Sequence, residues 1–164
     1  IGFDSNLGAA YAKAELGAGN NIPISGSVFL SVNNSDKKHI LSIARDLEEL
    51  GFKIVATEGT KTILNENGIC TEKVYKAGEG RPNIIDKIKN KEINLIINTP
   101  LGKQSRFDEY EIGKSAIKYK ISTLTTISAA QAMIRAIRIF KNDKLKYRSL
   151  QTIFNNKKEG ELIS

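Results

Sequence analysis

Short apolar runs alternate along this chain with segments whose apolar residues recur at helical spacing. The runs have the length of strands and occupy residues 27–32, 52–56, 73–76, 93–98 and 121–124. The helical segments occupy about residues 36–50, 60–67, 108–119 and 127–140, with a further short helix starting at Pro82. Because right-handed βαβ crossovers leave few other layouts, this alternation predicts a three-layer α/β/α fold with a five-stranded parallel sheet.

Capping and turn residues predict where several helices begin and end. Ser35 or Asp36 can cap the helix after the first strand, and Gly51 suits the position just beyond its last turn. Gly68 is expected to stop the short helix after the second strand. Pro82 suits the first position of the next helix, where a missing N–H costs nothing.

The composition is ordinary for a globular domain and argues against several classes of partner. No apolar stretch approaches the roughly 20 residues that span a bilayer, so we expect no membrane contact. The net charge of +7 comes from lysines interspersed with carboxylates, without the aromatic-interleaved basic stripe of a nucleic-acid site. Cys70, the single cysteine, excludes an internal disulfide; we expect it to be buried and the chain to be cytoplasmic.

The ends of the chain differ from its centre. Residues 1–26 combine a helical stretch over 7–16 with a Gly-, Asn- and Pro-containing linker, and the start at Ile1 suggests a piece of something longer. Residues 27–142 hold the alternating segments and form the predicted domain. Residues 143–164 are polar, and we expect this tail to be partly disordered, residues 155–164 above all.

In parallel sheets, ligands bind beyond the carboxyl ends of the strands, near the point where the strand order reverses. The corresponding loops here are rich in hydroxyl, amide and cationic side chains. They cover residues 31–37, 57–60, 76–82, 98–103 and 125–126. This edge of the sheet is therefore the predicted binding edge.

The sequence Thr57-Glu58-Gly59-Thr60 joins the second strand to a helix. Gly59 would let an anion approach the backbone closely, and the two threonine hydroxyls would lie beside unpaired helical N–H groups. A phosphate or carboxylate can bind at such a corner without any catalytic group. The simpler alternative is that Thr60 only caps the helix and Gly59 only shapes the turn.

Several motifs, taken in order, resemble a known family, the methylglyoxal-synthase-like (MGS-like) domain, with its flavodoxin-like layout. The resemblance is closer to the version at the C-terminus of carbamoyl-phosphate synthase large subunits. It rests on Gly2-Phe3-Asp4, residues 10–14, 29–32 with Asp36-Lys37, 56–60, Glu79-Gly80-Arg81-Pro82-Asn83-Ile84-Ile85-Asp86, and 96–100. On this resemblance, residues 1–26 would be the end of the preceding carbamoyl-phosphate domain and its linker.

The resemblance implies an allosteric module without catalytic residues, metal or cofactor of its own. Such domains bind an effector of the UMP or IMP type, or N-acetylglutamate in animal urea-cycle members, and regulate a glutamine-hydrolysing ligase of pyrimidine and arginine biosynthesis. The full enzyme would use ATP with Mg or Mn. Its implied partners are the rest of the large subunit and the glutaminase small subunit.

Matched residue by residue, the resemblance predicts the effector pocket at Ser31, Lys37, Thr57, Gly59, Thr60, Lys76, Asn98 and Thr99. The phosphate would lie at Thr57, Gly59 and Thr60, with charge-assisted bonds from Lys37 and Lys76. The remaining three would contact the sugar or base. Pro100 and Thr123 depart from some relatives, which carry a hydroxyl residue and a tyrosine there, so base preference and ornithine regulation stay open.

Three enzyme or switch classes share this type of fold. Methylglyoxal synthase, a phosphate-eliminating lyase, needs a carboxylate base and a histidine; Glu79 and His39 are the nominal candidates, but His39 is expected on a helix surface. The purine-synthesis cyclohydrolase fits the Glu-Gly-Arg-Pro stretch poorly. A receiver domain would need acidic residues where Asn33 and Asn34 stand.

Overall fold

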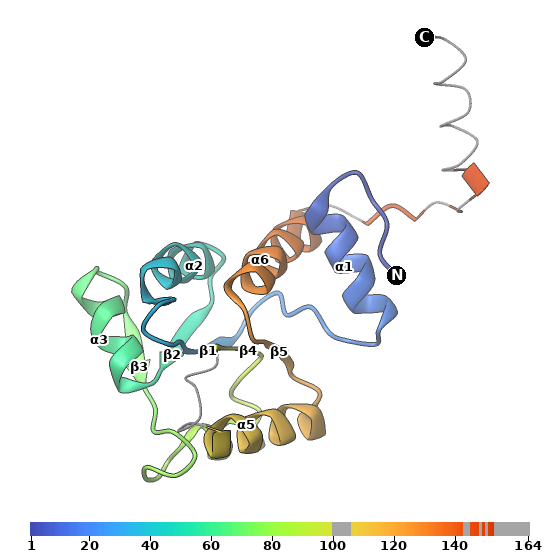
Figure 1. Ribbon diagram of the computed structural model, residues 1–164. Helices are drawn as coiled ribbons and strands as arrows, with labels where there is room; N and C mark the ends of the chain where they lie inside the picture. The colour runs from blue at the N-terminus through green and yellow to red at the C-terminus, as the bar shows by residue number, and fades with distance from the viewer. Residues whose placement is uncertain (100–105, 143–144, 148, 150, 153–164) are drawn as a thin grey trace.

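A five-stranded parallel sheet forms the centre of the molecule in the computed structural model, which describes residues 1–99, 106–142, 145–147, 149 and 151–152 (Figure 1). The strands are β1 (Ser27–Ser31), β2 (Lys53–Ala56), β3 (Thr71–Lys73), β4 (Leu95–Asn98) and β5 (Ser122–Leu124). Their order is β3-β2-β1-β4-β5, and every neighbouring pair is parallel. The predicted α/β fold class is confirmed.

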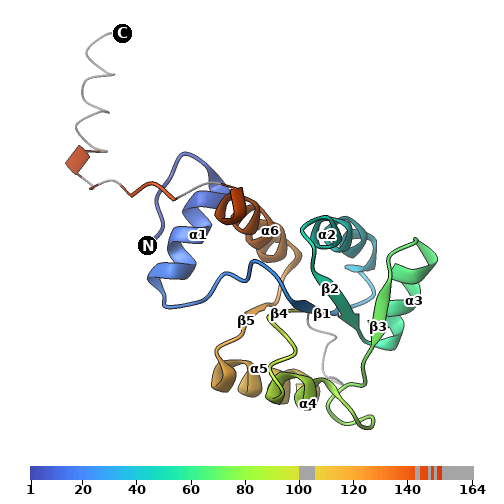
Figure 2. The same ribbon diagram turned by 180° about the vertical axis from the view of Figure 1, so that it is seen from behind.

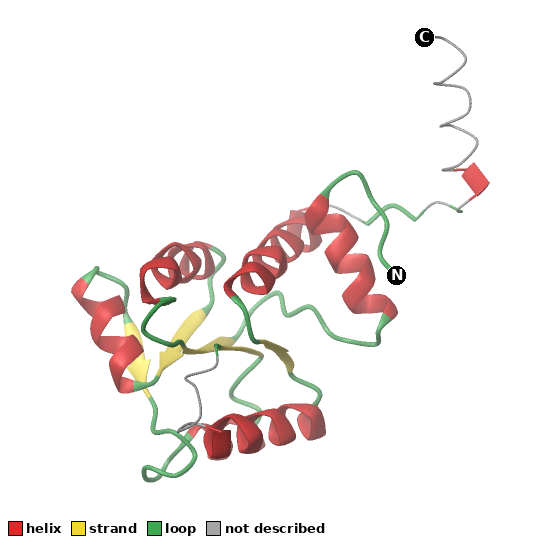
Figure 3. Ribbon diagram, viewed as in Figure 1, coloured by secondary structure: helices red, strands yellow, loops and turns green. Residues whose placement is uncertain are grey.

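Helices cover both faces of the sheet. They are α1 (Leu7–Gly17), α2 (Lys37–Glu49), α3 (Glu58–Glu66), α4 (Ile84–Lys89), α5 (Arg106–Tyr119) and α6 (Ile127–Asn142). Helices α2, α3 and α6 pack on one face, and α4 and α5 on the other, as the view from behind shows (Figure 2). Figure 3 shows the strands as the layer between them. No helix in the described part of the chain is both long and apolar enough to cross a membrane.

The central strands are buried on both faces because their side chains alternate between two apolar clusters. Val28 and Leu30 of β1 face the cluster under α2 and α6, whereas Phe29 between them faces the cluster under α4 and α5. All three side chains are fully buried. This period of two explains why the strands read as continuous apolar runs.

Helix α1 packs on α6 through small side chains. Gly8 lies so close that a Cβ atom there would come within 2.8 Å of the carbonyl oxygen of Arg135. Ala9 and Ala12 are buried along the same contact. Residues 7–17 therefore pack on the α/β unit, while the predicted division into 1–26, 27–142 and 143–164 stays a prediction. The predicted disorder of 155–164 falls outside the described residues.

Two predicted helix starts are wrong. Helix α3 begins at Glu58 with Thr57 as N-cap, so Thr60 lies within the first turn and does not cap it. Helix α4 begins at Ile84 because Asn83 caps it: the Asn83 side chain accepts from the N–H of Asp86, whose carboxylate accepts from the N–H of Asn83. Pro82 therefore precedes the helix instead of opening it.

The third strand and the cysteine also differ from prediction. β3 spans Thr71–Lys73 because the neighbouring strand β2 ends at Ala56, opposite Lys73. Beyond this point Tyr75 forms an isolated bridge to Asn83 and does not extend the strand. Cys70 is exposed. Its neighbours Ile69 and Thr71 are buried, so strand alternation turns the Cys70 side chain outward at this edge.

Candidate functional site

The carboxyl ends of β1 and β4 meet at the switch point of the sheet. From β1 the chain builds β2 and β3 on one side and then crosses to β4 and β5 on the other. Ser31 pairs in register with Asn98 at this point, and both side chains are buried. The strand-end rule therefore brings together two of the predicted residues, from positions far apart in the sequence.

Two buried threonines hold the loop that follows β1. The N–H of Val32 donates to Thr60 Oγ1 at 3.3 Å, and the N–H of Asn33 donates to Thr99 Oγ1 at 3.0 Å. Thr60 is 2% and Thr99 1% exposed. Each hydroxyl oxygen thus accepts from the loop backbone and keeps its own proton to donate. Their clearest structural role is to position the loop that carries Asn33 and leads to Lys37.

The first turn of α3 presents unpaired backbone donors at this edge. The carbonyl of Thr57 accepts from the N–H groups of Thr60 (3.0 Å) and Lys61 (2.8 Å). Within the described residues, the N–H groups of Glu58 and Gly59 have no acceptor. Gly59 is exposed. Unpaired N–H groups and the helix dipole make such a turn attractive to anions.

Lys37, the first residue of α2, brings a positive charge to the same turn. Its Nζ lies 3.7 Å from the position that a Cβ atom of Gly59 would take. Lys37 is partly exposed and forms no ion pair with any described residue. The preceding Asp36 is instead bound by Asn33, whose Nδ2 donates to Asp36 Oδ2 at 2.7 Å. The Lys37 ammonium is therefore available to an anion on α3.

Two lysines near this edge, Lys73 and Lys76, are paired with carboxylates. Lys76 contacts Glu79 within its own loop, with 3.4 Å between Nζ and Oε1. Lys73, which the sequence prediction missed, forms an ion pair with Glu58 in the first turn of α3. This pairing lowers the pKa of the Glu58 carboxyl and raises that of the Lys73 ammonium.

The structure thus connects seven of the eight predicted residues, Ser31, Lys37, Thr57, Gly59, Thr60, Asn98 and Thr99, through strand ends, the loop after β1 and the first turn of α3. Lys76 is attached instead to Glu79. The length of β2 is the signal that could have identified Lys73. β2 and β3 pair as far as Ala56 and Lys73, and α3 starts two residues after Ala56, so Lys73 lies beside the start of that helix.

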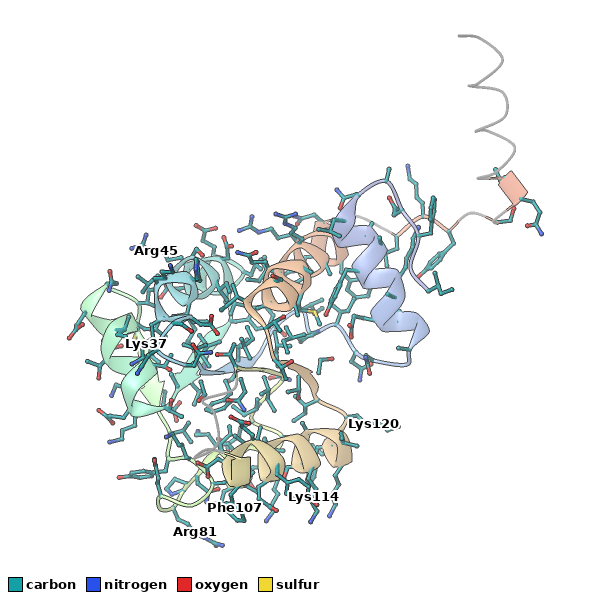
Figure 4. All side chains as sticks on the ribbon, in the orientation of Figure 1. Lys37, Arg45, Arg81, Phe107, Lys114 and Lys120 are labelled. Carbon is teal, nitrogen blue, oxygen red and sulfur yellow. The ribbon has the colours of Figure 1, made fainter. Side chains whose placement is uncertain are left out.

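A cavity of about 630 Å³ lies elsewhere, at the β5 edge of the sheet. Residues of α1, α5, β5 and the turn between α5 and β5 line it, among them Tyr11, Glu15, Ile117, Lys120 and Thr123. Burial and the Glu15 carboxylate raise the pKa of Tyr11 to about 12. None of the eight predicted residues lines this cavity, and in Figure 4 Lys37 lies at the left beside α2, whereas Lys120 lies at the right end of α5.

The two candidate residues for lyase chemistry, His39 and Glu79, form no hydrogen bond or ion pair with each other in the described part of the chain. His39 is exposed on α2, and Glu79 is bound to Lys76 in the loop after β3. A general base must lie within hydrogen-bonding reach of the proton that it removes, usually with a partner that orients it. No described residue forms an ion pair or hydrogen bond with the imidazole of His39.

A family model of the MGS-like domain matches residues 39–125, more than half of the chain, including most of α2, the first turn of α3 and the ends of β4 and β5. The chain belongs to the MGS-like domain family. The resemblance seen in the sequence motifs is confirmed.

Proteins similar to this chain over almost its full length are carbamoyl phosphate synthase large chains. The chain is 46% identical over 151 residues to the one of Nostoc sp. and 45% identical over 152 residues to the one of Archaeoglobus fulgidus, covering 92% of this chain in each case. It spans 14% of the length of each of these relatives. A protein of Methanopyrus kandleri named "Carbamoyl phosphate synthase large chain, C-terminal section" is 46% identical over 154 residues, 93% of this chain and 28% of that protein. The chain is thus consistent with the C-terminal MGS-like domain of a large chain.

Proposed function

We propose that this chain is the effector-binding domain of a glutamine-hydrolysing carbamoyl-phosphate synthase and binds a phosphate-bearing nucleotide of the UMP or IMP type. The observation that carries the proposal is the first turn of α3, where the N–H groups of Glu58 and Gly59 lie beside the Lys37 ammonium, which forms no ion pair with any described residue. The likeness to large chains over more than nine-tenths of this chain supports the same function.

Each predicted residue has a proposed role that is compatible with its position. The phosphate would bind the first turn of α3 after Thr57, with Gly59 allowing close approach and Lys37 adding a charge-assisted bond. Ser31 and Asn98, at the adjoining strand ends, would hydrogen-bond the sugar or base.

The other three proposed residues would act less directly. Thr60 and Thr99 would keep the loop after β1 in place, since both hydroxyls already accept from its backbone. Lys76 would reach the phosphate only after leaving Glu79.

Binding here would regulate carbamoyl-phosphate synthesis by the rest of the large subunit, which would act with ATP, Mg or Mn and the glutaminase small subunit. Allosteric coupling of this kind is worth about 1–3 kcal/mol and requires effector contacts that differ between active and inactive arrangements. Helix α1 packs on α6 and is the first helix of the described chain, so it is the proposed route for this coupling. A methylglyoxal synthase-type lyase is the less favoured alternative because His39 is exposed and separate from Glu79's contacts.

Isothermal titration calorimetry of this chain with UMP, IMP and N-acetylglutamate tests the proposal. We expect a nucleotide to bind, with affinity that falls as salt is raised because an ammonium group contributes. Lys37→Ala should weaken binding about tenfold, the usual size of one charge-assisted contact. Lys89→Ala, on the opposite helical layer, removes the same charge as a control. No binding by any of the three compounds would contradict the proposal.

A further inference from the structure

Among the described residues, two lysines from outside α3 approach its first turn, and a carboxylate neutralises one of them. Lys37 approaches Gly59 from α2 and has no carboxylate partner among the described residues. Lys73 approaches from the end of β3 and pairs with Glu58, the first residue of the helix. The same turn that offers N–H donors to an anion therefore already carries a negative side chain.

The pair between Glu58 and Lys73 can be broken by a ligand. Both side chains are accessible, at 62% and 41% exposure, and exposed pairs of this kind contribute little to stability. The Lys73 ammonium also lies 5.2 Å from the centre of the Tyr75 ring, so it keeps a second contact near the site when Glu58 is absent. Breaking the pair would give the first turn of α3 a second available cation.

We propose that Glu58 acts as an internal competitor that sets how tightly the site binds a phosphate group. It occupies Lys73 and places a negative charge in the turn that would receive the phosphate. A bound phosphate must displace Glu58 from Lys73 or bind without that lysine, and either route lowers affinity. This inference rests on the proposed effector function, and it assigns Glu58 a role in tuning affinity that Thr57, Gly59 and Lys37 do not have.

The test compares Glu58→Gln, Lys73→Met and the double variant by calorimetry with UMP and with inorganic phosphate at constant ionic strength. Glu58→Gln should tighten binding of both about three- to tenfold, the effect of removing one screened like charge near the phosphate. Lys73→Met should weaken binding only slightly in the wild-type background, but several-fold in the Glu58→Gln background, where Lys73 is released. Glu66→Gln, at the other end of α3, removes the same charge about 12 Å away and should leave the affinity unchanged.

The outcomes separate this inference from the function on which it rests. If the wild-type chain binds UMP and Glu58→Gln binds it no more tightly, the competitor role is overturned while the effector function stands. The competitor role is also overturned if Lys73→Met weakens UMP binding equally in the wild-type and Glu58→Gln backgrounds. If no variant binds UMP or phosphate, the proposed function and this inference both fail.

Discussion

Replacing Gly59 with alanine should separate the stability of the domain from its anion binding. Gly59 lies in the first turn of α3 with no positive φ, so a Cβ atom fits the backbone without strain. The nearest atom to that Cβ would be Lys37 Nζ at 3.7 Å, an ordinary van der Waals distance from the end of a flexible side chain. Gly59→Ala should therefore raise the free energy of unfolding by about 0.4–1 kcal/mol, chiefly because alanine restricts the unfolded chain.

The same methyl group should hinder a phosphate, because it occupies the space between Lys37 and the N–H groups that would receive the phosphate. We expect UMP affinity to fall at least tenfold while the melting temperature rises by about 1–4 °C. Thermal unfolding followed by circular dichroism, together with calorimetric titration of UMP, measures both quantities.

Gly113→Ala is the matched control for this experiment. Gly113 lies within α5, and a Cβ atom there would meet nothing within 4 Å. It should give a similar gain in stability and leave UMP binding unchanged. A loss of stability in Gly59→Ala would refute the helical placement of Gly59, and unchanged UMP binding would refute an anion at this turn.

Two further perturbations test the structure around the site and at the opposite edge. Thr99→Val should lower the free energy of unfolding by about 1–3 kcal/mol, because it leaves the partly buried N–H of Asn33 without its acceptor. The control Thr123→Val, at an exposed position, should change the free energy of unfolding by no more than about 0.5 kcal/mol. A urea titration measures both. The pKa of Tyr11 is raised from 10.0 to about 12 in the folded domain, so the phenol of the unfolded chain ionises at a lower pH than that of the folded chain. The contribution of this group to the free energy of unfolding should therefore be fully present below pH 10 and be lost as the pH rises towards 12. Tyr11→Phe should remove this part of the fall in the free energy of unfolding above pH 10. If the variant and the wild-type chain lose stability identically as the pH rises, the prediction is contradicted.

Much of the fold follows from local pattern, because the features that carry it are local. The strand-length apolar runs and the helical spacing of Ile40, Ile43 and Leu47 are set by periods of two and 3.6, which any window of the sequence displays. Gly51 ends α2 with a φ of +81°, as its position after the last apolar residue predicts.

Two of the errors arose at boundaries that contact a distant segment. Both Thr57 and Thr60 can cap a helix, and in the structure the Thr60 hydroxyl accepts instead from the N–H of Val32, 28 positions away. Likewise β3 ends at Lys73 because β2 ends opposite it, a fact that the sequence around Lys76 does not contain. The cavity beside Tyr11 was also missed, since it forms only when α1 packs near α5 and β5.

Amide chemical shifts during a UMP titration show directly where on the domain the nucleotide binds. We expect the largest ¹H–¹⁵N shift changes on Glu58 and Gly59, with smaller changes at Asn33 and Lys37, because the phosphate would bind the N–H groups of this turn that have no acceptor among the described residues. Changes concentrated on Lys120 and Thr123, around the cavity at the β5 edge, would contradict it.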